Sequence, residues 1–476
     1  MKIVIVNPPR FQDSSVTREG RCEFICNYRV DTPATLLIIA SLLSNQKYQI
    51  DFIDANAKDL DYRIIGNLLK NKYPDCVIFT FNSWIIDHDL IICKIAKEIN
   101  PVCKTIGYSW FAKNFSIEIL SKFKNLDIQI IEDPFSVIES LMDCLNNRGN
   151  LEKIEGIAYK NSDNEIKINN KLKIKKSFEE LPFPAYNLIE SFKPYYLYTP
   201  FLKPYALVYA GKGCPYSCAY CPDANTKYSG RSAEDIVEEL KVLKNLGKIK
   251  YVWFYDQVFT INRKRVINFC KKMIEENLNI SWFCDTRADL VDERLLKLMK
   301  TAGCIGVAYG IESGSQKILD NMKKSISIIQ AIRALKWTRK AKIPIQLNLI
   351  LGYVGEDINT LKETGNFIRL ILPEFLQISF IIAMSGTEFT HLAIKNDWIS
   401  NELGSKDKFT DLPLDKNRYK PFQLNLQKEI RKLFKAIFLN LRWWTICIKS
   451  LINNRQLIIP ILGMLLYRSK SIKILK

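Results

Sequence analysis

Short apolar runs alternate with amphipathic stretches over the first 148 residues of the chain. The apolar runs, which are rich in β-branched residues, cover 2–6, 49–53, 76–81, 104–107 and 128–131. The stretches between them place apolar residues at helical spacing, over 35–45, 60–72, 87–99, 115–124 and 135–146. Strands that alternate with helices in this way predict a doubly wound, mostly parallel sheet. We therefore expect an α/β, Rossmann-like domain over residues 1–148.

A second alternating block begins after residue 200. Its predicted strands cover 206–209, 251–254, 280–283, 305–309, 345–350 and 376–380. Its predicted helices cover 232–246, 263–277, 291–302, 315–321, 326–341 and 357–371. Six such repeats predict a partial (β/α)6 barrel over 201–400, whose functional residues lie at the carboxyl ends of the strands. Residues 149–200 form a proline-punctuated connector, and 401–476 are predicted to be helical and basic.

The positive charge of the chain is concentrated in its last part. The chain carries a net charge of +19, and residues 416–476 hold 14 Lys and Arg against one acid, Glu429. This part therefore contributes +13 and leaves +6 for all other residues. A nucleic-acid-binding protein would spread its cations over a docking face, so nucleic acid is not an expected partner.

The last residues also suggest contact with a membrane surface. Residues 428–476 interleave Lys and Arg with Leu, Ile, Phe and Trp, and 457–467 are uncharged and mostly apolar. That run is shorter than the roughly 18 residues of a spanning helix. Cations and tryptophans around apolar residues suit a helix that lies in the membrane interface. The alternative is a helical cap on the barrel, with the basic residues in water.

Cysteine usage and the first residues favour the cytoplasm. The chain begins with an apolar strand and Asn-Pro-Pro rather than with a signal peptide, and its 13 cysteines are irregularly spaced. A large chain of this kind fits a reducing compartment better than a disulfide framework. Cys22 and Cys26 form a C-x3-C pair that nothing nearby completes, so we interpret them as ordinary loop thiols.

Three cysteines carry the strongest chemical signal. Cys214, Cys218 and Cys221 follow the first strand of the second block with the spacing C-x3-C-x2-C, and Tyr220 precedes the last of them. A cubane iron–sulfur cluster normally takes four thiolates, so three of them leave one iron open to a substrate. A structural zinc site needs a fourth ligand, and the two histidines, His88 and His391, are far away in the sequence. The alternatives are three ordinary thiols in a turn or half of a zinc site.

Polar residues end the strands that follow. Asp256 and Gln257 come after the second strand of this block, and Asp285 and Arg287 after the third. The fourth ends in Gly-Ile-Glu-Ser-Gly at 310–314, and the fifth in Gly-Tyr-Val-Gly-Glu at 352–356. Glycines allow close approach of the backbone to a ligand, and carboxylates suit amino and hydroxyl groups. Together with the cysteines these ends predict a site for a nucleoside-like ligand.

These motifs resemble a known family. Tyr-Asp-Gln-Val-Phe at 255–259, Cys-Asp-Thr-Arg-Ala-Asp at 284–289 and Gly-Ile-Glu-Ser-Gly-Ser-Gln at 310–316 are similar to the core of the cobalamin-dependent radical S-adenosylmethionine (SAM) enzymes. That class includes anaerobic magnesium-protoporphyrin cyclase and methyltransferases that act on unactivated carbon. The resemblance spans about residues 1–400. It implies that a 4Fe–4S cluster cleaves SAM to a 5′-deoxyadenosyl radical.

The resemblance also implies roles for individual residues. Three thiolates would hold the cluster, and the ends of the barrel strands would bind SAM. The cluster ligands would be Cys214, Cys218 and Cys221, and the SAM contacts Tyr220, Asp256, Gln257, Arg287, Glu312, Ser313 and Gly352. In particular, Asp256 and Gln257 would lie near the methionine amino group, Arg287 near the carboxylate or ribose, and Glu312 near the ribose.

The resemblance places cobalamin between the N-terminal sheet and the barrel mouth. The residues expected near it are Pro8, Asp54, Ser83 and Tyr108. Two later loops of the sheet depart from the family pattern, because Gly107-Tyr-Ser and Ile131-Glu-Asp-Pro stand where glycine-rich turns are usual. The runner-up is therefore a radical SAM enzyme that has lost cobalamin.

The resemblance implies radical activation of a C–H bond, followed by methyl transfer or cyclisation. We expect an apolar or lipid-like substrate, an external electron donor such as flavodoxin or ferredoxin, and anaerobic conditions. A protein of another class remains open: a non-catalytic iron–sulfur or zinc module bound to a membrane or nucleic acid.

Overall fold

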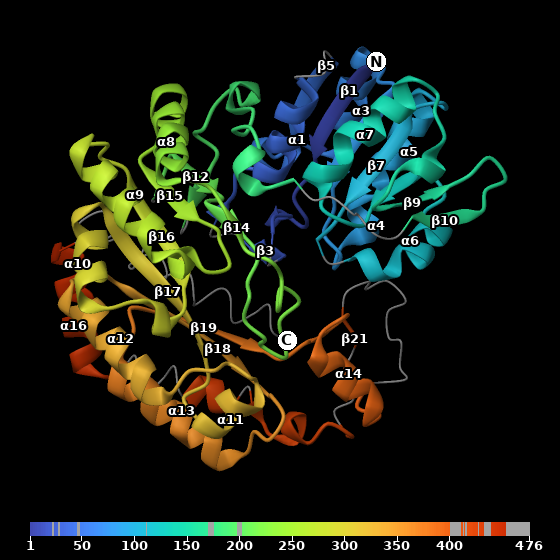
Figure 1. Ribbon diagram of the computed structural model, residues 1–476. Coiled ribbons are helices and arrows are strands. Elements are labelled where there is room, and N and C mark those ends of the chain that lie inside the picture. The colour runs from blue at the N-terminus through green and yellow to red at the C-terminus, as the bar shows by residue number, and fades with distance from the viewer. Residues whose placement is uncertain are drawn as a thin grey trace.

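The computed structural model describes residues 1–20, 23–26, 29–44, 48–110, 112–169, 176–197, 202–399, 411–412, 414, 417–426, 428–432 and 439–453. Cys22 and the apolar run 457–467 lie outside these residues, as do all residues after 453. Two sheets, each with its own helices, make up the two halves of the molecule (Figure 1).

The N-terminal sheet is mixed, with a parallel core. Its strands are β1 Lys2–Asn7, β5 Gln49–Asp54, β6 Cys76–Thr80, β7 Lys104–Tyr108, β8 Ile128–Ile130, β9 Ile157–Lys160 and β10 Ile166–Asn169. They lie in the order β10-β9-β8-β7-β6-β1-β5. β9 pairs antiparallel with β8 on one side and with β10 on the other. The order of the strands along the chain reverses between β1 and β6. The carboxyl ends of the strands at such a point are the usual place for a ligand.

Alternation along β1 explains the two helical layers of this half. Ile3 and Ile5 pack in one buried cluster with α1 Ala34–Ser44 and α7 Pro134–Asn146. Val4 and Val6 pack in another with α3 Tyr62–Lys72, α5 Ile91–Ile99 and α6 Ser116–Lys122. Successive side chains of a strand point to opposite faces, so an unbroken apolar run is buried on both. The predicted doubly wound arrangement is confirmed.

The second sheet contains six parallel strands in the described part of the chain. They are β12 Tyr205–Val208, β15 Tyr251–Phe254, β16 Ser281–Thr286, β17 Cys304–Glu312, β18 Ile345–Leu351 and β19 Phe375–Phe380, paired in this order. The covering helices are α8 Ala233–Gly247, α9 Arg263–Glu275, α10 Glu293–Thr301, α12 Ile328–Lys340 and α13 Ile358–Ile371. Each is N-capped by a polar side chain, from Ser232, Asn262, Asp292, Ser327 and Asp357 respectively.

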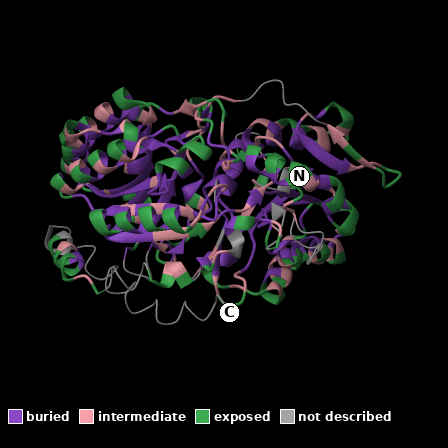
Figure 2. Ribbon diagram, turned by 90° about the horizontal axis from the view of Figure 1, so that it is seen from below, coloured by how far each residue is buried: buried purple, intermediate pink, exposed green. Residues whose placement is uncertain are grey.

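This sheet curves as an open barrel with its helices on the outside (Figure 1). Its buried side chains form one large cluster that includes Trp282, Phe254 and Tyr309. Figure 2 shows the strands of both halves as buried, with helices whose outer sides are exposed. The predicted partial barrel agrees with this arrangement of six strand–helix repeats.

The segment between β1 and α1 joins the two halves. It contains β2 Ser15–Thr17, β3 Phe24–Cys26 and β4 Arg29–Val30, and β4 pairs with β11 Tyr196–Leu197 of the connector. The Thr32 hydroxyl accepts a hydrogen bond from the Leu207 amide at 2.9 Å, so the segment is bonded to the first barrel strand. Val30 and Leu37 are members of the barrel's buried cluster. The two halves therefore share a core.

The helix α16 Leu441–Asn453 packs on the barrel through one side only. Trp443 and Cys447 are buried, and the Trp443 indole donates to the Pro373 carbonyl at 2.8 Å. Leu441, Trp444 and Ile448 are exposed at helical spacing. No helix in the described residues is both long and apolar enough to cross a bilayer.

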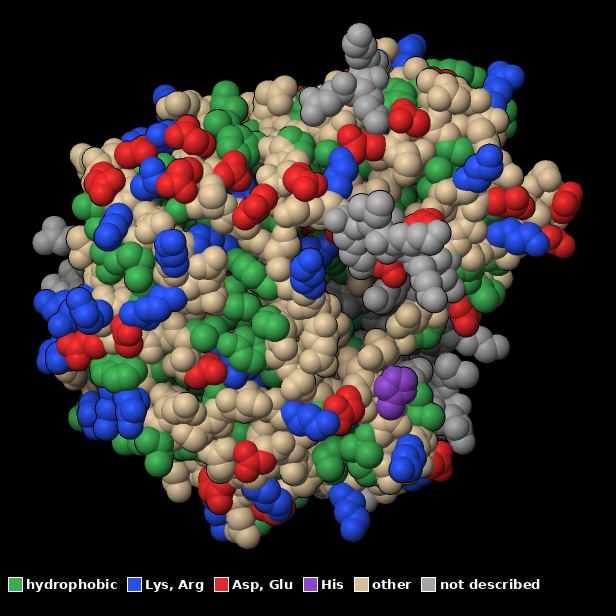
Figure 3. Space-filling model, in the orientation of Figure 1, with side chains coloured by type: hydrophobic (Ala, Val, Ile, Leu, Met, Phe, Trp, Pro, Cys, Tyr) green, Lys and Arg blue, Asp and Glu red, His purple; other side chains and the backbone are tan. Residues whose placement is uncertain are grey.

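Acidic and basic side chains intermingle over the face of the molecule seen in Figure 3.

Candidate radical SAM site

The cysteine loop leaves the first barrel strand through a short antiparallel ladder. β13 Gly211–Lys212 pairs with β14 Ser229–Gly230 at the base of the loop. Gly213 has φ +92°, and a Cβ there would lie 2.2 Å from the Lys227 carbonyl oxygen, so only glycine fits. The Cys214 amide then donates to the Thr226 hydroxyl at 2.8 Å, and the Thr226 amide donates back to the Cys214 carbonyl at 3.0 Å.

The other side of the loop is tied to the far end of the barrel. The Ala219 amide donates to the Met322 carbonyl at 3.0 Å, just after α11 Gln316–Asn321. The Ala219 carbonyl accepts from the Phe389 amide at 2.8 Å, in α14 Glu388–Lys395. Burial raises the pKa of both Cys214 and Cys221, which disfavours their thiolates until iron binds.

The three cysteines line a cavity of about 380 Å³ that lies between the two halves of the protein. Four other residues expected at the site also line it, namely Tyr220, Gln257, Arg287 and Glu312. The remaining charged residues of the lining are Glu23, Asp223, Asp285 and Lys324. No three His, Cys, Asp or Glu side chains among the described residues are placed to hold a single metal ion. A cubane cluster takes one thiolate per iron and so does not need its ligands to converge on one point.

Arg287 offers an unused donor at this cavity. Its Nε and Nη2 donate to the Asp289 carboxylate at 2.9 and 3.1 Å, and Nη2 also donates to the Lys324 carbonyl at 2.9 Å. The guanidinium lies 3.7 Å from the centre of the Tyr216 ring. Its Nη1 is buried and has no hydrogen-bond partner in the described part of the chain. Buried donors are normally satisfied, so this atom is suited to an acceptor on a ligand.

Lys324 links two residues that were expected at the site, although the sequence did not single it out. Its Nζ lies 2.9 Å from the Glu312 carboxylate and 3.2 Å from the Tyr220 hydroxyl. Burial is the largest influence and acts to lower the pKa of Lys324, but the charge and hydrogen bond of Glu312 together with the nearby Cys218 outweigh it, and the pKa is raised. Glu312 has φ +76° at a register shift between β17 and β18, which turns its side chain toward the cavity. No periodic signal marks Lys324, which lies in the loop after α11.

Three of the expected SAM contacts are engaged within the protein and do not line the cavity. The Asp256 carboxylate accepts from the amides of Ala210 and Gly211 at 2.7 and 3.0 Å, and so fixes the start of the cysteine loop. Ser313 lies 3.2 Å from the Thr364 hydroxyl. The Gly352 carbonyl accepts from the Tyr419 hydroxyl at 2.7 Å.

The four residues expected near cobalamin lie at the strand ends but are also bonded within the protein. The Pro8 carbonyl accepts from Arg18 at 3.0 Å. Asp54 accepts from Asn7, Ala57 and Tyr195 at 2.8–2.9 Å. The Ser83 amide donates to Glu23 at 2.8 Å, and the buried Tyr108 ring packs against Trp110 with centres 5.3 Å apart. None of the four lines the cavity.

Two other residues of the N-terminal half line the cavity instead. They are Glu23, after β2, and Trp84, after β6. The Glu23 carboxylate is held by the Ser83 amide and by the hydroxyl of Ser109 at 3.1 Å. Burial raises the pKa of Glu23 to about 7. Trp84 directly follows Ser83, at a strand end that the sequence predicts to face a ligand, whereas nothing in the sequence marks Glu23.

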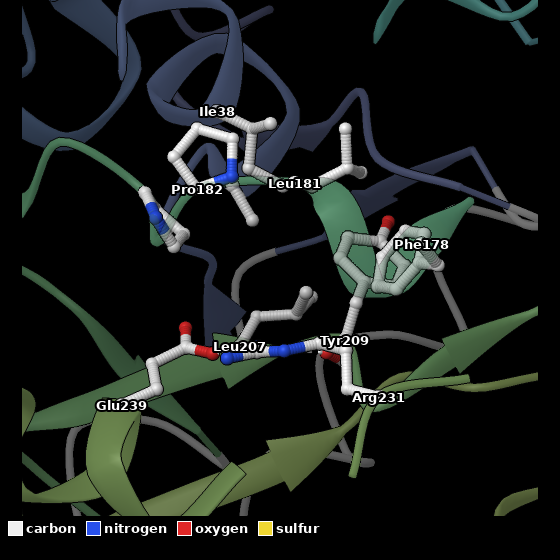
Figure 4. A pocket seen from close by; sticks show the side chains of 10 residues that line it. Ile38, Phe178, Leu181, Pro182, Leu207, Tyr209, Arg231 and Glu239 are labelled. Atoms are coloured by element: carbon white, nitrogen blue, oxygen red, sulfur yellow. Dashed lines mark hydrogen bonds and ion pairs between the residues drawn. The ribbon is translucent and has the colours of Figure 1, made fainter. Parts of the chain in front are cut away.

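A second, much smaller cavity of about 10 Å³ lies between α1, the connector and β12. Figure 4 shows Arg231 and Glu239 reaching toward each other beneath Phe178, Leu181 and Pro182. The two form a buried ion pair, and the Tyr186 hydroxyl also donates to Glu239 at 2.5 Å. The space suits at most a single water molecule, and its lining comes from α1, the connector and the barrel, so this region is a packed contact between the two halves.

Residues 208–368 match the family model described as the radical SAM superfamily. The chain contains a radical SAM domain. This domain covers the barrel from the end of β12 to α13 and includes all three cysteines. It implies a 4Fe–4S cluster and SAM as cofactors, and the expectation of a radical SAM enzyme is confirmed.

Relatives in other organisms carry enzyme names. The chain is 26% identical to a Pyrococcus horikoshii protein named as an uncharacterized methyltransferase, over 96% of both chains. It is 27% identical to the anaerobic magnesium-protoporphyrin IX monomethyl ester cyclase of Rubrivivax gelatinosus, over 71% of this chain and 62% of the cyclase.

Solved structures share the fold. The methyltransferase TsrM from Kitasatospora setae, with cobalamin and a 4Fe–4S cluster bound, matches with a TM-score of 0.66 at 14% identity. That match covers 84% of this chain and 76% of TsrM. OxsB, with aqua-cobalamin and SAM bound, matches with a TM-score of 0.70 at 16% identity, over 89% of this chain and 65% of OxsB. The radical SAM domain and its N-terminal sheet thus have the arrangement found in these two proteins.

Proposed function

We propose that this radical SAM enzyme uses a corrinoid and transfers a methyl group to an apolar substrate, or cyclises it. The observation that carries the proposal is the cavity, which is lined by the three cysteines and by two residues of the N-terminal half, Glu23 and Trp84. A site shared in this way allows one substrate to meet two cofactors. The relatives named methyltransferase and cyclase support both outcomes.

The SAM side of the cavity is supplied by the barrel. Cys214, Cys218 and Cys221 would hold the cluster, which supplies the electron that cleaves SAM to a 5′-deoxyadenosyl radical. We assign the free Nη1 of Arg287 to the carboxylate of SAM, because a charged acceptor makes the strongest bond with a guanidinium. Glu312, oriented by Lys324, is suited to the ribose hydroxyls.

The corrinoid side is supplied by the N-terminal half. Glu23 and Trp84 present a fixed carboxylate and an indole that is 42% exposed, next to the edge where β1 and β6 meet. We therefore assign them to the corrinoid in place of Pro8, Asp54, Ser83 and Tyr108. A specific observation favours the runner-up without cobalamin, because the polar groups of Pro8, Asp54 and Ser83 already have partners in the protein.

Anaerobic reconstitution with iron, sulfide and hydroxocobalamin tests the proposal. We expect a stoichiometric corrinoid absorption band after gel filtration, and 5′-deoxyadenosine when the reduced protein meets SAM. 5′-Deoxyadenosine without a corrinoid band would support the runner-up. If the reduced protein forms no 5′-deoxyadenosine, and if its binding properties are unchanged in the Cys218→Ala variant, it is instead a non-catalytic iron–sulfur or zinc module.

We also propose that the enzyme acts in the cytoplasm, takes electrons from flavodoxin or ferredoxin, and touches the inner face of the membrane. The exposed stripe Leu441, Trp444 and Ile448 belongs to the basic part of the sequence, which suits an anionic lipid surface. Full-length protein should sediment with phosphatidylglycerol vesicles. The Leu441→Glu/Ile448→Glu variant should lose this binding, whereas Leu246→Glu, at an exposed position of α8, should keep it. Equal binding by both variants would show that the stripe is not the surface that binds lipid.

A further inference from the structure

The inner faces of the last two barrel strands carry uncharged residues only. Side chains two apart on a strand share a face, so Gln377, Ser379 and Ile381 follow one another along and just beyond β19. Asn348 and Ile350 do so on β18. All five line the cavity. This side of the cavity therefore presents uncharged polar and apolar groups side by side.

The cavity thus has two chemically different walls. The wall near the cysteines carries charges, from Asp223, Asp285, Arg287, Glu312 and Lys324. We call the opposite side the far wall. It consists of uncharged residues, which are Asn348, Leu349, Ile350, Gln377, Ser379, Phe380, Ile381, Ile382 and Met384. Charged groups suit SAM, so the far wall is left for the substrate.

Hydrogen bonds orient the amide groups of the far wall. The Gln346 Nε2 donates to the Asn348 Oδ1 at 3.0 Å and to the Gln377 Oε1 at 3.3 Å. The oxygen of Gln377 is therefore occupied, which leaves its NH2 group as the remaining polar group. In the described part of the chain, neither this NH2 group nor the Ser379 hydroxyl has a hydrogen-bond partner, and Ser379 is exposed. Both can donate to a ligand in the cavity.

We infer that the far wall binds an uncharged substrate through an oxygen acceptor, such as a ketone or ester carbonyl. Gln377 and Ser379 donate to that oxygen, and the apolar body lies against Ile350 and Ile381, which follow the polar residues on the same faces of the two strands. A carboxylate or phosphate would lose its water there without meeting a cation among the described residues of that wall, which disfavours anionic substrates. This inference rests on the proposed function, since it names the substrate class of the same site.

Three probes of equal ring size test the inference on the reconstituted holoenzyme with SAM bound. They are naphthalene, methyl 2-naphthoate and 2-naphthoate, and their binding is measured by equilibrium dialysis. The ester should bind about tenfold more tightly than naphthalene, as expected for one or two neutral hydrogen bonds. It should also bind at least tenfold more tightly than the carboxylate.

The Gln377→Leu variant should prefer the ester over naphthalene less strongly than the wild type does, because only the Ser379 donor remains, while naphthalene binding is unchanged. Gln49→Leu, on the exposed start of β5, is the matched control and should behave as the wild type. Tightest binding of the carboxylate, or an unchanged preference for the ester in Gln377→Leu, would overturn the inference. Formation of 5′-deoxyadenosine without substrate is measured in parallel. If the wild-type protein forms none, the proposed function fails; if it forms 5′-deoxyadenosine but ranks the probes differently, only the inference fails.

Discussion

Replacing Lys324 with methionine should destabilise the protein because it leaves a buried carboxylate without its cation. The side chains of Lys324 and Glu312 are 7% and 10% exposed, and their charged atoms are 2.9 Å apart. Methionine keeps most of the volume of the lysine stem, so packing changes little. The loss of stability therefore reports mainly on the charge of Glu312.

The magnitude follows from the burial of the pair. Removing one partner of a buried ion pair costs about 3–5 kcal/mol, whereas removing both charges is often close to neutral. We expect Lys324→Met to lower the free energy of unfolding by about 3 kcal/mol. The double variant Lys324→Met/Glu312→Gln should recover about 2 kcal/mol of that loss, since no unpaired charge remains.

Urea denaturation of the protein without cluster, followed by circular dichroism, measures these differences. Lys323→Met is the control, because Lys323 pairs with Glu388 at the surface, where both side chains are more than half exposed. That change should cost less than about 1 kcal/mol. If Lys324→Met costs no more than Lys323→Met, or if the double variant is less stable than either single variant, the ion pair does not have the role argued for it.

Three further predictions concern the cysteine loop, the buried acids Glu19 and Glu23, and α16. Gly213→Ala should abolish cluster binding, measured as iron per chain after reconstitution, because its Cβ would lie 2.2 Å from the Lys227 carbonyl at φ +92°; full iron content would contradict this. Burial raises the pKa of Glu19 to about 8 and of Glu23 to about 7, from 4.5, so both acids stabilise the fold when protonated. Their contribution to stability should therefore be full below about pH 4.5 and be lost as the pH rises through 7 to 8, and Glu19→Gln should flatten this fall in thermal unfolding scans. Trp443→Ala should cost about 3–5 kcal/mol in urea denaturation, because a buried indole and its bond to Pro373 are lost, and Trp444→Ala on the exposed side should cost less than about 1 kcal/mol; equal effects would mean that α16 is not docked by Trp443.

Much of the fold could be predicted from the chain because its signals are local. Strand β1 illustrates this, because Ile3 and Ile5 pack on one face of the sheet and Val4 and Val6 on the other. This alternation is a property of neighbouring residues. The order of helices and strands in both halves followed from such patterns. The loop with Cys214, Cys218 and Cys221 was equally accessible, because its spacing and Gly213 lie within a few residues.

The roles of the other site residues depend on contacts between distant parts of the chain. Asp256 follows a barrel strand as expected, yet its carboxylate bonds to Ala210 and Gly211 and lies outside the cavity. Residues at a strand end can point either toward a ligand or into the adjoining turn. The sequence shows the residue type but not the direction, because the direction depends on which neighbours offer donors.

The sequence by itself determined the two alternating blocks and the three-cysteine motif, since periodicity and spacing are written in neighbouring residues. Only the tertiary structure brought Lys324 to Glu312 and Tyr220, and Glu23 and Trp84 to the cavity of the cysteines. Those contacts join separate helices, strands and halves of the molecule. They arise when apolar faces are buried against one another, and that packing, rather than any local pattern, decides which polar groups meet.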